Sequence, residues 1–310
     1  MVRYMTRRLL YALLTLWLIA TLTFVLMKQL PGDPLGEGAE RIPQETRALL
    51  LRQYGLDKPL WQQYATYMGH VAHGDLGVSY QFPAQRVTDI IRQALPASLE
   101  LGLWSLALAA AMGLTLGMYA AMRHNRAGDY AAMLVAVMGV AVPSMIAGPL
   151  LSYFVGVKLG WLPAGLWEGP QHRVLPALAL SFGTVAVLAR LMRATLLEVL
   201  QMDYIQTARA KGLSGPAVLI RHALRNALLP VLTIIGPIFV NVITGTLVVE
   251  QVFAVPGLGK HFVESVYAND YTMIAGLTIF YSALLIAVMW LTDVLYGWVD
   301  PRIRLQKGGA

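Results

Sequence analysis

Long stretches without a charged residue constrain this 310-residue chain more than any other feature of its sequence. Five of them have 19 to 28 residues and contain no Lys, Arg, Asp or Glu: 9–27, 101–122, 130–157, 227–249 and 271–292. A sixth, at 174–189, is shorter and reaches Met192 if Arg190 extends to the membrane surface. About 20 apolar residues in a helix cross a bilayer. Since 57% of the residues are hydrophobic and 13% are charged, we predict an all-α polytopic membrane protein with six transmembrane helices.

The first apolar stretch follows basic residues, as it would in a cleaved signal peptide. Its 19 apolar residues exceed the roughly 7–15 of a signal peptide. The sequence Lys28-Gln29-Leu30-Pro31 also lacks a small-residue cleavage site. We therefore expect a retained N-terminal helix within residues 1–30.

Basic residues predict the orientation, because cytoplasmic loops of membrane proteins are enriched in Lys and Arg. With the N-terminus inside, the cytoplasmic segments carry 14 basic and four acidic residues, and the external segments carry ten basic and eleven acidic residues, not counting Glu100 and Asp293 at the edges of their spans. Both termini are therefore predicted to be cytoplasmic. The net charge of +7 is explained by the excess of basic residues in the cytoplasmic segments. Nucleic-acid binding is not expected, since the basic residues are divided among four short segments.

The loops divide the chain into four predicted parts. Residues 1–30 form the first helix, and residues 31–96 form an external, partly helical region with an amphipathic pattern after Pro43. Residues 97–298 form a transmembrane core with an internal loop at 196–226, and residues 299–310 form a cytoplasmic tail. An internal loop as long as residues 196–226 is usually either functional or disordered. Its helical pattern argues against disorder.

The internal loop has the pattern of a helix, a turn and a second helix, which we call the elbow (residues 203–215). Asp203 is expected to cap the first helix, and Gly212 suits the left-handed position after its end. Ser214 is expected to cap the second helix, with Pro216 in its first turn. This second helix continues into the fifth span.

The surface of the elbow is basic and carries small side chains. Arg209 and Lys211 lie near the end of the first helix, where cations are favoured. Ala208 and Ala210 would let a partner surface approach closely. The residues alone leave open whether the elbow binds a partner or only connects two spans.

The elbow resembles the cytoplasmic loop of permease subunits in bacterial ATP-binding-cassette (ABC) peptide importers. The resemblance lies in residues 207–213, Thr-Ala-Arg-Ala-Lys-Gly-Leu, and in residues 221–230, Arg-His-Ala-Leu-Arg-Asn-Ala-Leu-Leu-Pro. In that family the loop is a coupling helix that docks into an ATPase subunit. The resemblance implies this role for Asp203, Tyr204, Gln206, Thr207, Ala208, Arg209, Lys211 and Gly212.

The resemblance extends over nearly the whole chain as an ordered set of short motifs. These are Arg7-Arg8, Pro31-Gly32-Asp33-Pro34, Tyr54-Gly55-Leu56-Asp57-Lys58-Pro59, Gly74-Asp75-Leu76-Gly77, Pro256-Gly257-Leu258-Gly259, Asp270-Tyr271, Asp293-Val294-Leu295-Tyr296-Gly297 and Asp300-Pro301-Arg302. It implies the fold of a type I importer permease in the bacterial inner membrane. The implied partners are a homologous second permease in a heterodimer, two ATPase subunits, an external peptide-binding protein and membrane lipid.

No catalytic or metal site is predicted. The chain has no cysteine. A phosphate-binding loop needs Gly-x-x-x-x-Gly-Lys followed by Ser or Thr, whereas Ala254 and His261 stand at the first and last positions around Gly259 and Lys260. His70 and His73 have ligand-like spacing, but a zinc site needs one or two more donors, and with only Asp75 as a candidate a solvated external loop is the better reading. ATP and Mg²⁺ are therefore expected in the partner ATPase subunits, with no cofactor in this chain.

Polar and helix-breaking residues in two spans are candidates for lining or kinking a translocation path: Pro143, Pro149, Pro230, Pro237, Asn241 and Thr244. Ordinary kinks are an equal alternative for the prolines. A hydrogen bond to a neighbouring helix is the alternative for Asn241 and Thr244.

The second functional hypothesis is a self-contained channel or ion-coupled transporter. Coupling to ions usually requires carboxylates near the middle of the membrane. Glu100 and Asp293 stand only at the edges of their spans, which favours an external energy source. A membrane-bound enzyme has the least support.

The predicted function is the permease subunit of an ATP-driven, binding-protein-dependent peptide importer. The compact stretch at residues 158–173 resembles oligopeptide permeases, because some dipeptide permeases have a long insertion there. We therefore predict oligopeptides as substrates, with dipeptides, nickel complexes or glutathione as alternatives.

Overall fold

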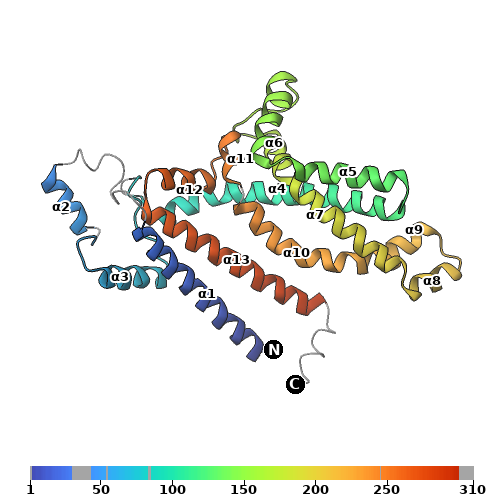
Figure 1. Cartoon of the computed structure of the whole chain (residues 1–310), viewed down its shortest axis with the longest axis horizontal. Coiled ribbons are helices and arrows are strands. Elements are labelled where there is room, and N and C mark those ends of the chain that lie inside the picture. Colours follow the sequence, from blue (N-terminus) through green and yellow to red (C-terminus); the bar gives the residue numbers. More distant parts are fainter. Residues whose placement is uncertain (1, 30–42, 54, 83–84, 245, 300–310) are drawn as a thin grey trace. The chain divides into compact units, whose positions relative to one another are not determined.

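The computed structural model describes residues 2–29, 43–53, 55–82, 85–244 and 246–299 (Figure 1). Within these ranges the regular elements are helices, apart from one bridge between Val78 and Arg86. The described part holds five helices long and apolar enough to cross a membrane, or six when a bent pair counts as one span. The predicted all-helical membrane fold is confirmed. The chain divides into two compact units, Met1–Pro96 with Gly257–Trp290 and Ala97–Pro256 with Leu291–Ala310.

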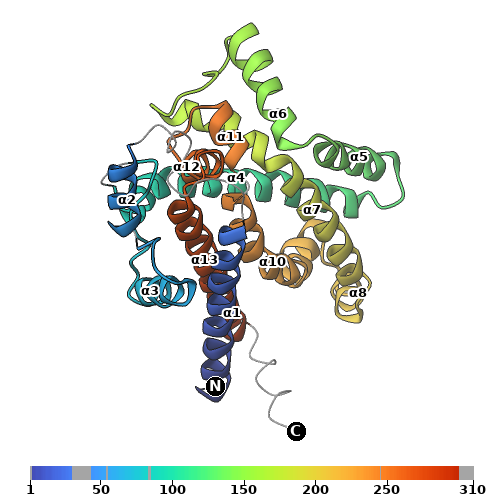
Figure 2. The same cartoon turned by 60° about the vertical axis from the view of Figure 1, so that its left-hand side comes forward.

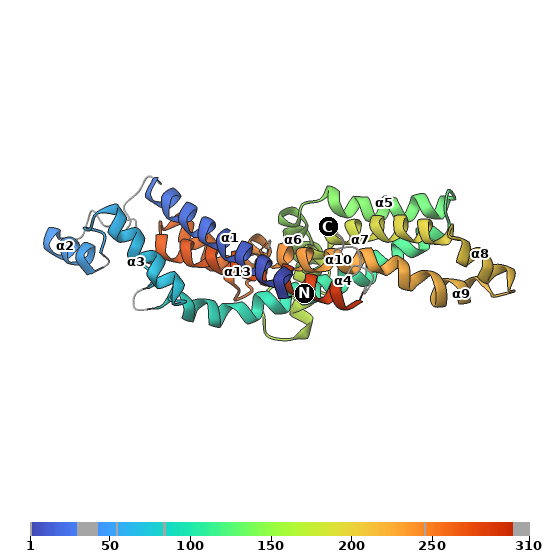
Figure 3. The same cartoon turned by 90° about the horizontal axis from the view of Figure 1, so that it is seen from below.

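The first unit contains α1 (Val2–Gln29), α2 (Gln44–Gln53), α3 (Leu60–Ala72), the start of α4 (Val87–Met122), α12 (Leu258–Tyr267) and most of α13 (Tyr271–Val299). Figures 1 and 3 show α1 and α13 side by side in opposite directions, so that α1 ends where α13 begins. Met27 of α1 is buried together with Ile274 and Ala275 of α13. These contacts fix the end of the first span against the start of the last.

Asp270 caps α13 and ties it to the segment before α4. One carboxylate oxygen accepts a hydrogen bond from the backbone N–H of Met273 at 3.0 Å, as a helix N-cap does. The other accepts from the Ser79 hydroxyl and from the backbone N–H groups of Tyr80 at 3.0 Å and Gln81 at 3.1 Å. Asp270 is fully buried, and these four bonds offset the cost of burying its carboxylate.

The second unit contains the rest of α4, α5 (Ala127–Ala141), α6 (Ser144–Leu151), η2 (Ser152–Lys158), η3 (Pro170–Arg173), α7 (Val174–Leu200), α8 (Asp203–Ala210), α9 (Gly215–Val218), η4 (Leu219–Ala223), α10 (Leu224–Thr244) and α11 (Leu247–Val252). α7 packs against α5, α6, α10 and α11 (Figure 3). In its apolar membrane-crossing stretch, half of the residues are buried inside the protein, whereas in that of α1 only 11% are. α7 is therefore the central helix of this unit.

Two glycines let α4 approach α7 closely. A Cβ atom on Gly117 would lie 2.5 Å from the carbonyl oxygen of Ala189, and one on Gly113 would lie 2.9 Å from that of Val185. Small residues four apart are a common device for close helix packing in membranes. This contact fixes the register between the two helices.

The third predicted span is broken at Pro143. α5 and the helix that begins at Ser144 are bent by 96° (Figure 2). Pro143 lacks a backbone N–H and disfavours helical geometry at the residue before it, and Val142 is extended with φ −104° and ψ 107°. Pro149 causes no such break and lies inside α6.

Two further helices are longer than their apolar stretches predict. α4 begins at Val87, so it includes residues 87–96 of the predicted external region. α7 continues to Leu200, beyond the expected end near residue 189. The region predicted to be external does contain short helices, α2 and α3, and the former begins directly after Pro43 as expected.

We expect Gly117→Ala to destabilise the protein by about 1–3 kcal/mol, because its Cβ would clash with backbone of α7. Gly183→Ala is the matched control within a helix, since nothing lies within 4 Å of its added Cβ. Thermal unfolding in detergent measures both. Equal melting temperatures for the two variants would contradict close α4–α7 packing.

Candidate functional site

The predicted elbow is present between α7 and α10. α8 begins at Asp203 and α9 begins at Gly215. The N-cap of α8 is Met202, whose backbone is extended, so the prediction that Asp203 caps this helix is wrong. Asp203 lies instead in the first turn, where its negative charge favours the helix dipole. Ser214 does occupy the N-cap position of α9, without a side-chain capping bond.

Gly212 ends α8 in the way its position predicted. Its φ is +80°, a left-handed conformation that favours glycine. Its N–H donates to the carbonyl of Arg209 at 2.9 Å, and the N–H of Leu213 donates to the carbonyl of Ala208 at 3.4 Å. This bonding pattern is a Schellman motif. It turns the chain sharply between the two helices of the elbow.

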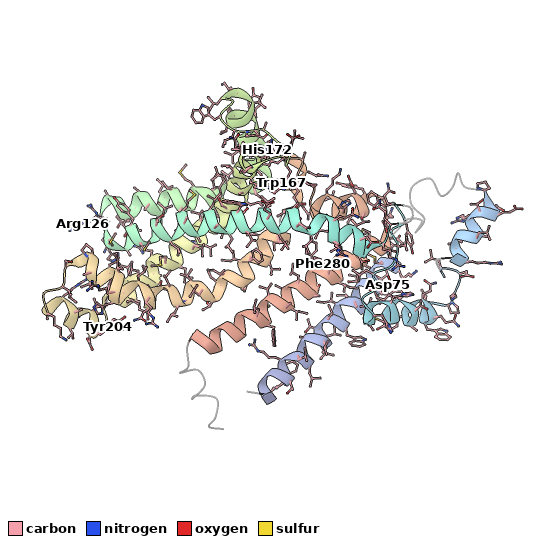
Figure 4. The ribbon with its side chains drawn as sticks, turned by 180° about the vertical axis from the view of Figure 1, so that it is seen from behind. Asp75, Arg126, Trp167, His172, Tyr204 and Phe280 are labelled. Carbon is pink, nitrogen blue, oxygen red and sulfur yellow. The ribbon has the colours of Figure 1, made fainter. Side chains whose placement is uncertain are left out.

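One face of α8 is anchored in the core of the second unit. Ile205 is fully buried and Ala208 is 5% exposed, in a cluster that includes Met192 of α7. The hydroxyl of Tyr204, which is labelled in Figure 4, accepts a hydrogen bond from the Asn226 amide of α10 at 2.7 Å. Ala208 therefore faces the core and offers no side chain to a partner, contrary to expectation.

The opposite face of α8 is exposed. It presents Asp203, Gln206, Thr207, Arg209, Ala210 and Lys211. Among the described residues, no carboxylate forms an ion pair with Arg209 or Lys211. The elbow thus combines an apolar anchor with a polar outer surface that carries two cations.

A buried ion pair fixes α7 near the elbow. Asp129 at the start of α5 is fully buried, and its two oxygens accept from Nε and Nη2 of Arg193, each at 2.6 Å. The backbone N–H of Asn125 donates to the same carboxylate at 3.0 Å. Figure 4 shows Arg126, in this turn, toward the same end of the unit as Tyr204 of the elbow. In the sequence, Arg193 only contributed to the predicted orientation. Its ion pair was missed because Asp129 lies 64 residues away.

A hollow of about 320 Å³ lies beside the break between α5 and α6. Pro143 lines it, together with Ser144, Gly183 and Thr184, and Asn241 of α10 lines it from another side. Pro143 and Asn241 thus line the same hollow. Pro149, Pro230 and Pro237 do not line this hollow, and the side chain of Thr244 lies outside the described ones.

Sequence reasoning missed a buried carboxyl group in the second unit. Glu250 of α11 is fully buried and accepts a hydrogen bond from the Ser98 hydroxyl at 2.6 Å. It follows the fifth apolar stretch by one residue, so its position in sequence resembles a membrane edge. Glu100, which was expected at such an edge, pairs with Arg173 at the start of α7 (Nη2 to Oε2, 3.2 Å).

The histidines that were examined as metal ligands have local partners. Nδ1 of His70 lies 3.0 Å from Oδ2 of Asp75, and Nδ1 of His73 lies 2.7 Å from the carbonyl oxygen of Gly69. No group of three or more metal-binding side chains occurs among the described residues. Gly257, within the sequence rejected as a phosphate-binding loop, is the N-cap residue of α12.

Comparison with known proteins identifies the family. Residues 113–305 match the family described as binding-protein-dependent transport system inner membrane component, and residues 1–102 match its N-terminal membrane-component family. The chain belongs to this family of transport components. It is therefore a multi-pass inner-membrane protein and a membrane transport subunit, as the sequence predicted.

Relatives match over the full length. The chain is 45% identical over 311 residues to the dipeptide transport system permease protein DppB of Bacillus subtilis, with all of both chains covered. It is 40% identical over 306 residues to the oligopeptide transport system permease protein OppB of Haemophilus influenzae, with 98% of this chain and all of that one covered. A chain of the inward-facing MetNI methionine ABC transporter has a TM-score of 0.57 at 17% identity, over 69% of this chain and 97% of that one. This likeness shows a shared fold.

Gly212→Ala should loosen the end of α8, because a left-handed residue with a Cβ costs about 1 kcal/mol. Backbone amides of residues 203–213 should then exchange with deuterium roughly fivefold faster. Gly215→Ala is the control, since this glycine has no positive φ and open space around it. Equal exchange in both variants would contradict the role of Gly212 in closing the helix.

Proposed function

We propose that the chain is the permease subunit of an ATP-driven, binding-protein-dependent importer of peptides. The full-length identity with permeases named for dipeptide and oligopeptide transport carries this proposal. The chain would pair with a homologous second permease and form half of the translocation path. Two ATPase subunits would bind ATP and Mg²⁺, and an external binding protein would deliver the peptide.

Oligopeptides are the proposed substrates within this class. The short connection at residues 158–173 favours them, although relatives named for dipeptides and for oligopeptides both match. Mass spectrometry of the peptides that co-purify with the cognate binding protein tests this choice. Peptides of two residues only would contradict it.

The exposed face of α8 is the proposed docking surface for an ATPase subunit. Arg209 and Lys211, which form no ion pair with a carboxylate of the described residues, suit a partner with acidic side chains. The outer face of α8 is polar and needs no lipid cover. Anchoring of Ile205 and the Tyr204–Asn226 bond would transmit movement of the elbow to α10. The Thr195 hydroxyl, which donates to the carbonyl of Ala227 at 3.0 Å, joins α7 to the same helix.

The hollow beside the α5–α6 break is the proposed wall of the translocation path. Asn241, Thr184 and Ser144 provide polar groups there, and Pro143 shapes the break. Pro149, Pro230, Pro237 and Thr244 remain predictions for other parts of the path.

The double variant Arg209→Glu with Lys211→Glu should abolish ATP-dependent peptide uptake by reconstituted complexes and reduce co-purification of the ATPase subunits. Reversal of two exposed charges removes the proposed attraction while the buried anchor stays intact. The control is Lys158→Glu, another exposed basic residue away from the elbow. Normal assembly and uptake in the double variant would overturn the docking proposal.

Gly183→Phe should reduce peptide uptake at least severalfold without loss of ATPase assembly, because its side chain would extend into the hollow. Gly69→Phe in α3 places the same side chain in open space away from the hollow. Uptake assays on both complexes measure the effect. Full uptake with Gly183→Phe would contradict the assignment of this hollow to the path.

A further inference from the structure

A second hollow, of about 440 Å³, lies within the first unit. It is bounded by the end of α1, by α3, by residues 75–80 and by the start of α13 (Figure 4, near Asp75). Its volume falls within the about 300–1,000 Å³ typical of sites for small molecules. Neither the elbow nor the proposed path uses it.

One part of this hollow is apolar and belongs to the ends of two membrane-spanning helices. Phe24 and Met27 of α1 and Ala275 and Ile279 of α13 line it. Met27 is buried together with Ile274 and Ala275 of α13, so this apolar lining lies where the ends of the two helices pack.

Another part of the hollow is basic. Lys28, Lys58 and Arg86 line it, and all three residues are exposed. None of them forms an ion pair with a carboxylate of the described residues. Nζ of Lys28 lies 5.7 Å from the centre of the Phe24 ring, so this cation stands where the apolar lining begins.

Among the described residues that line the hollow, one is a carboxylate, Asp75, and it is already bonded. Oδ1 of Asp75 accepts from the N–H of Gly77 at 3.0 Å, and Oδ2 lies 3.0 Å from Nδ1 of His70. The hydrogen bond from Gly77, with help from His70 and Arg86, lowers the pKa of Asp75, which therefore stays ionised at neutral pH. Three cations and one carboxylate leave the lining with a net charge of 3 − 1 = +2.

We propose that this hollow binds an anionic phospholipid, with the headgroup phosphate at Lys28, Lys58 and Arg86 and acyl chains over Phe24 and Met27. Basic pockets beside membrane helices recognise anionic headgroups in this way. A soluble anion would need only the cations, whereas the apolar lining at the ends of α1 and α13 matches a molecule with tails. The site is separate from the elbow, so the proposal does not depend on transport.

The test is lipid retention by the purified full-length chain in nanodiscs of phosphatidylglycerol and phosphatidylcholine in equal amounts. Native mass spectrometry after transfer to detergent counts the bound lipids. The wild-type chain should retain phosphatidylglycerol selectively. The double variant Lys28→Gln with Arg86→Gln should lose this selectivity, by about fivefold for each basic side chain removed.

Lys158→Gln is the matched control, because Nζ of Lys158 also lies 5.7 Å from a phenylalanine ring centre, that of Phe154, but outside the hollow. It should retain phosphatidylglycerol as the wild type does. Thermal unfolding with added phosphatidylglycerol is the second measurement, and its stabilising effect should be smaller in each single variant, Lys28→Gln and Arg86→Gln.

Three results would overturn the proposal. The first is equal retention of phosphatidylcholine and phosphatidylglycerol by the wild type. The second is an equal loss of retention in the Lys158 control. The third is stabilisation by inorganic phosphate alone as large as that by phosphatidylglycerol, which would indicate a site for a soluble anion.

Discussion

The backbone of a chain in hydrocarbon must satisfy its own hydrogen bonds, and the rest of this structure depends on that constraint. It explains why the regular elements of the described part are helical and why the apolar stretches are long. Non-helical backbone at membrane depth is tolerated only where protein covers it or a cavity borders it. The break at Val142 and Pro143 meets this condition, since both residues line the hollow of the second unit. Pro143 thus both breaks the span and lines the hollow that we propose as the wall of the path.

α7 connects the core of the second unit to the elbow. Close approach at Gly113 and Gly117 and the Asp129–Arg193 ion pair hold this helix between Val185 and Arg193. Its last turn leads into α8, where Ile205 is buried. Under the proposed function, these packed and bidentate contacts would carry movement of the elbow to the helices that line the hollow. Burial of one face of α8 also leaves the other face free for a partner.

The sequence predicted those features that follow from local patterns. Charge-free stretches predicted the spans, and Gly212 predicted the end of α8 because only its backbone conformation was needed. The cap of α8 was predicted wrongly, since Asp203 and Met202 are adjacent and local preference could not decide between them. The orientation of the termini and the coupling role of the elbow remain predictions.

Long-range pairs could not be predicted from one sequence. Glu250 bonds to Ser98 from 152 residues away, and Asp270 bonds to Ser79 from 191 residues away. Each of these acids looked like an ordinary loop residue, because nothing in its neighbourhood signals the distant partner. The basic residues of the hollow in the first unit, Lys28, Lys58 and Arg86, are likewise far apart in sequence and come together only in the folded unit.

The central claim is that the exposed face of α8 docks into an ATPase subunit. The chain has no cysteine, so single substitutions Thr207→Cys and Ala210→Cys on that face can be labelled with a maleimide without background. The most direct measurement compares labelling rates of the chain alone and in complex with its ATPase subunits. The account predicts fast labelling of the free chain and strong protection in the complex at both positions, with no protection for Ala65→Cys on exposed α3. Unchanged labelling at residues 207 and 210 in the assembled complex would contradict it.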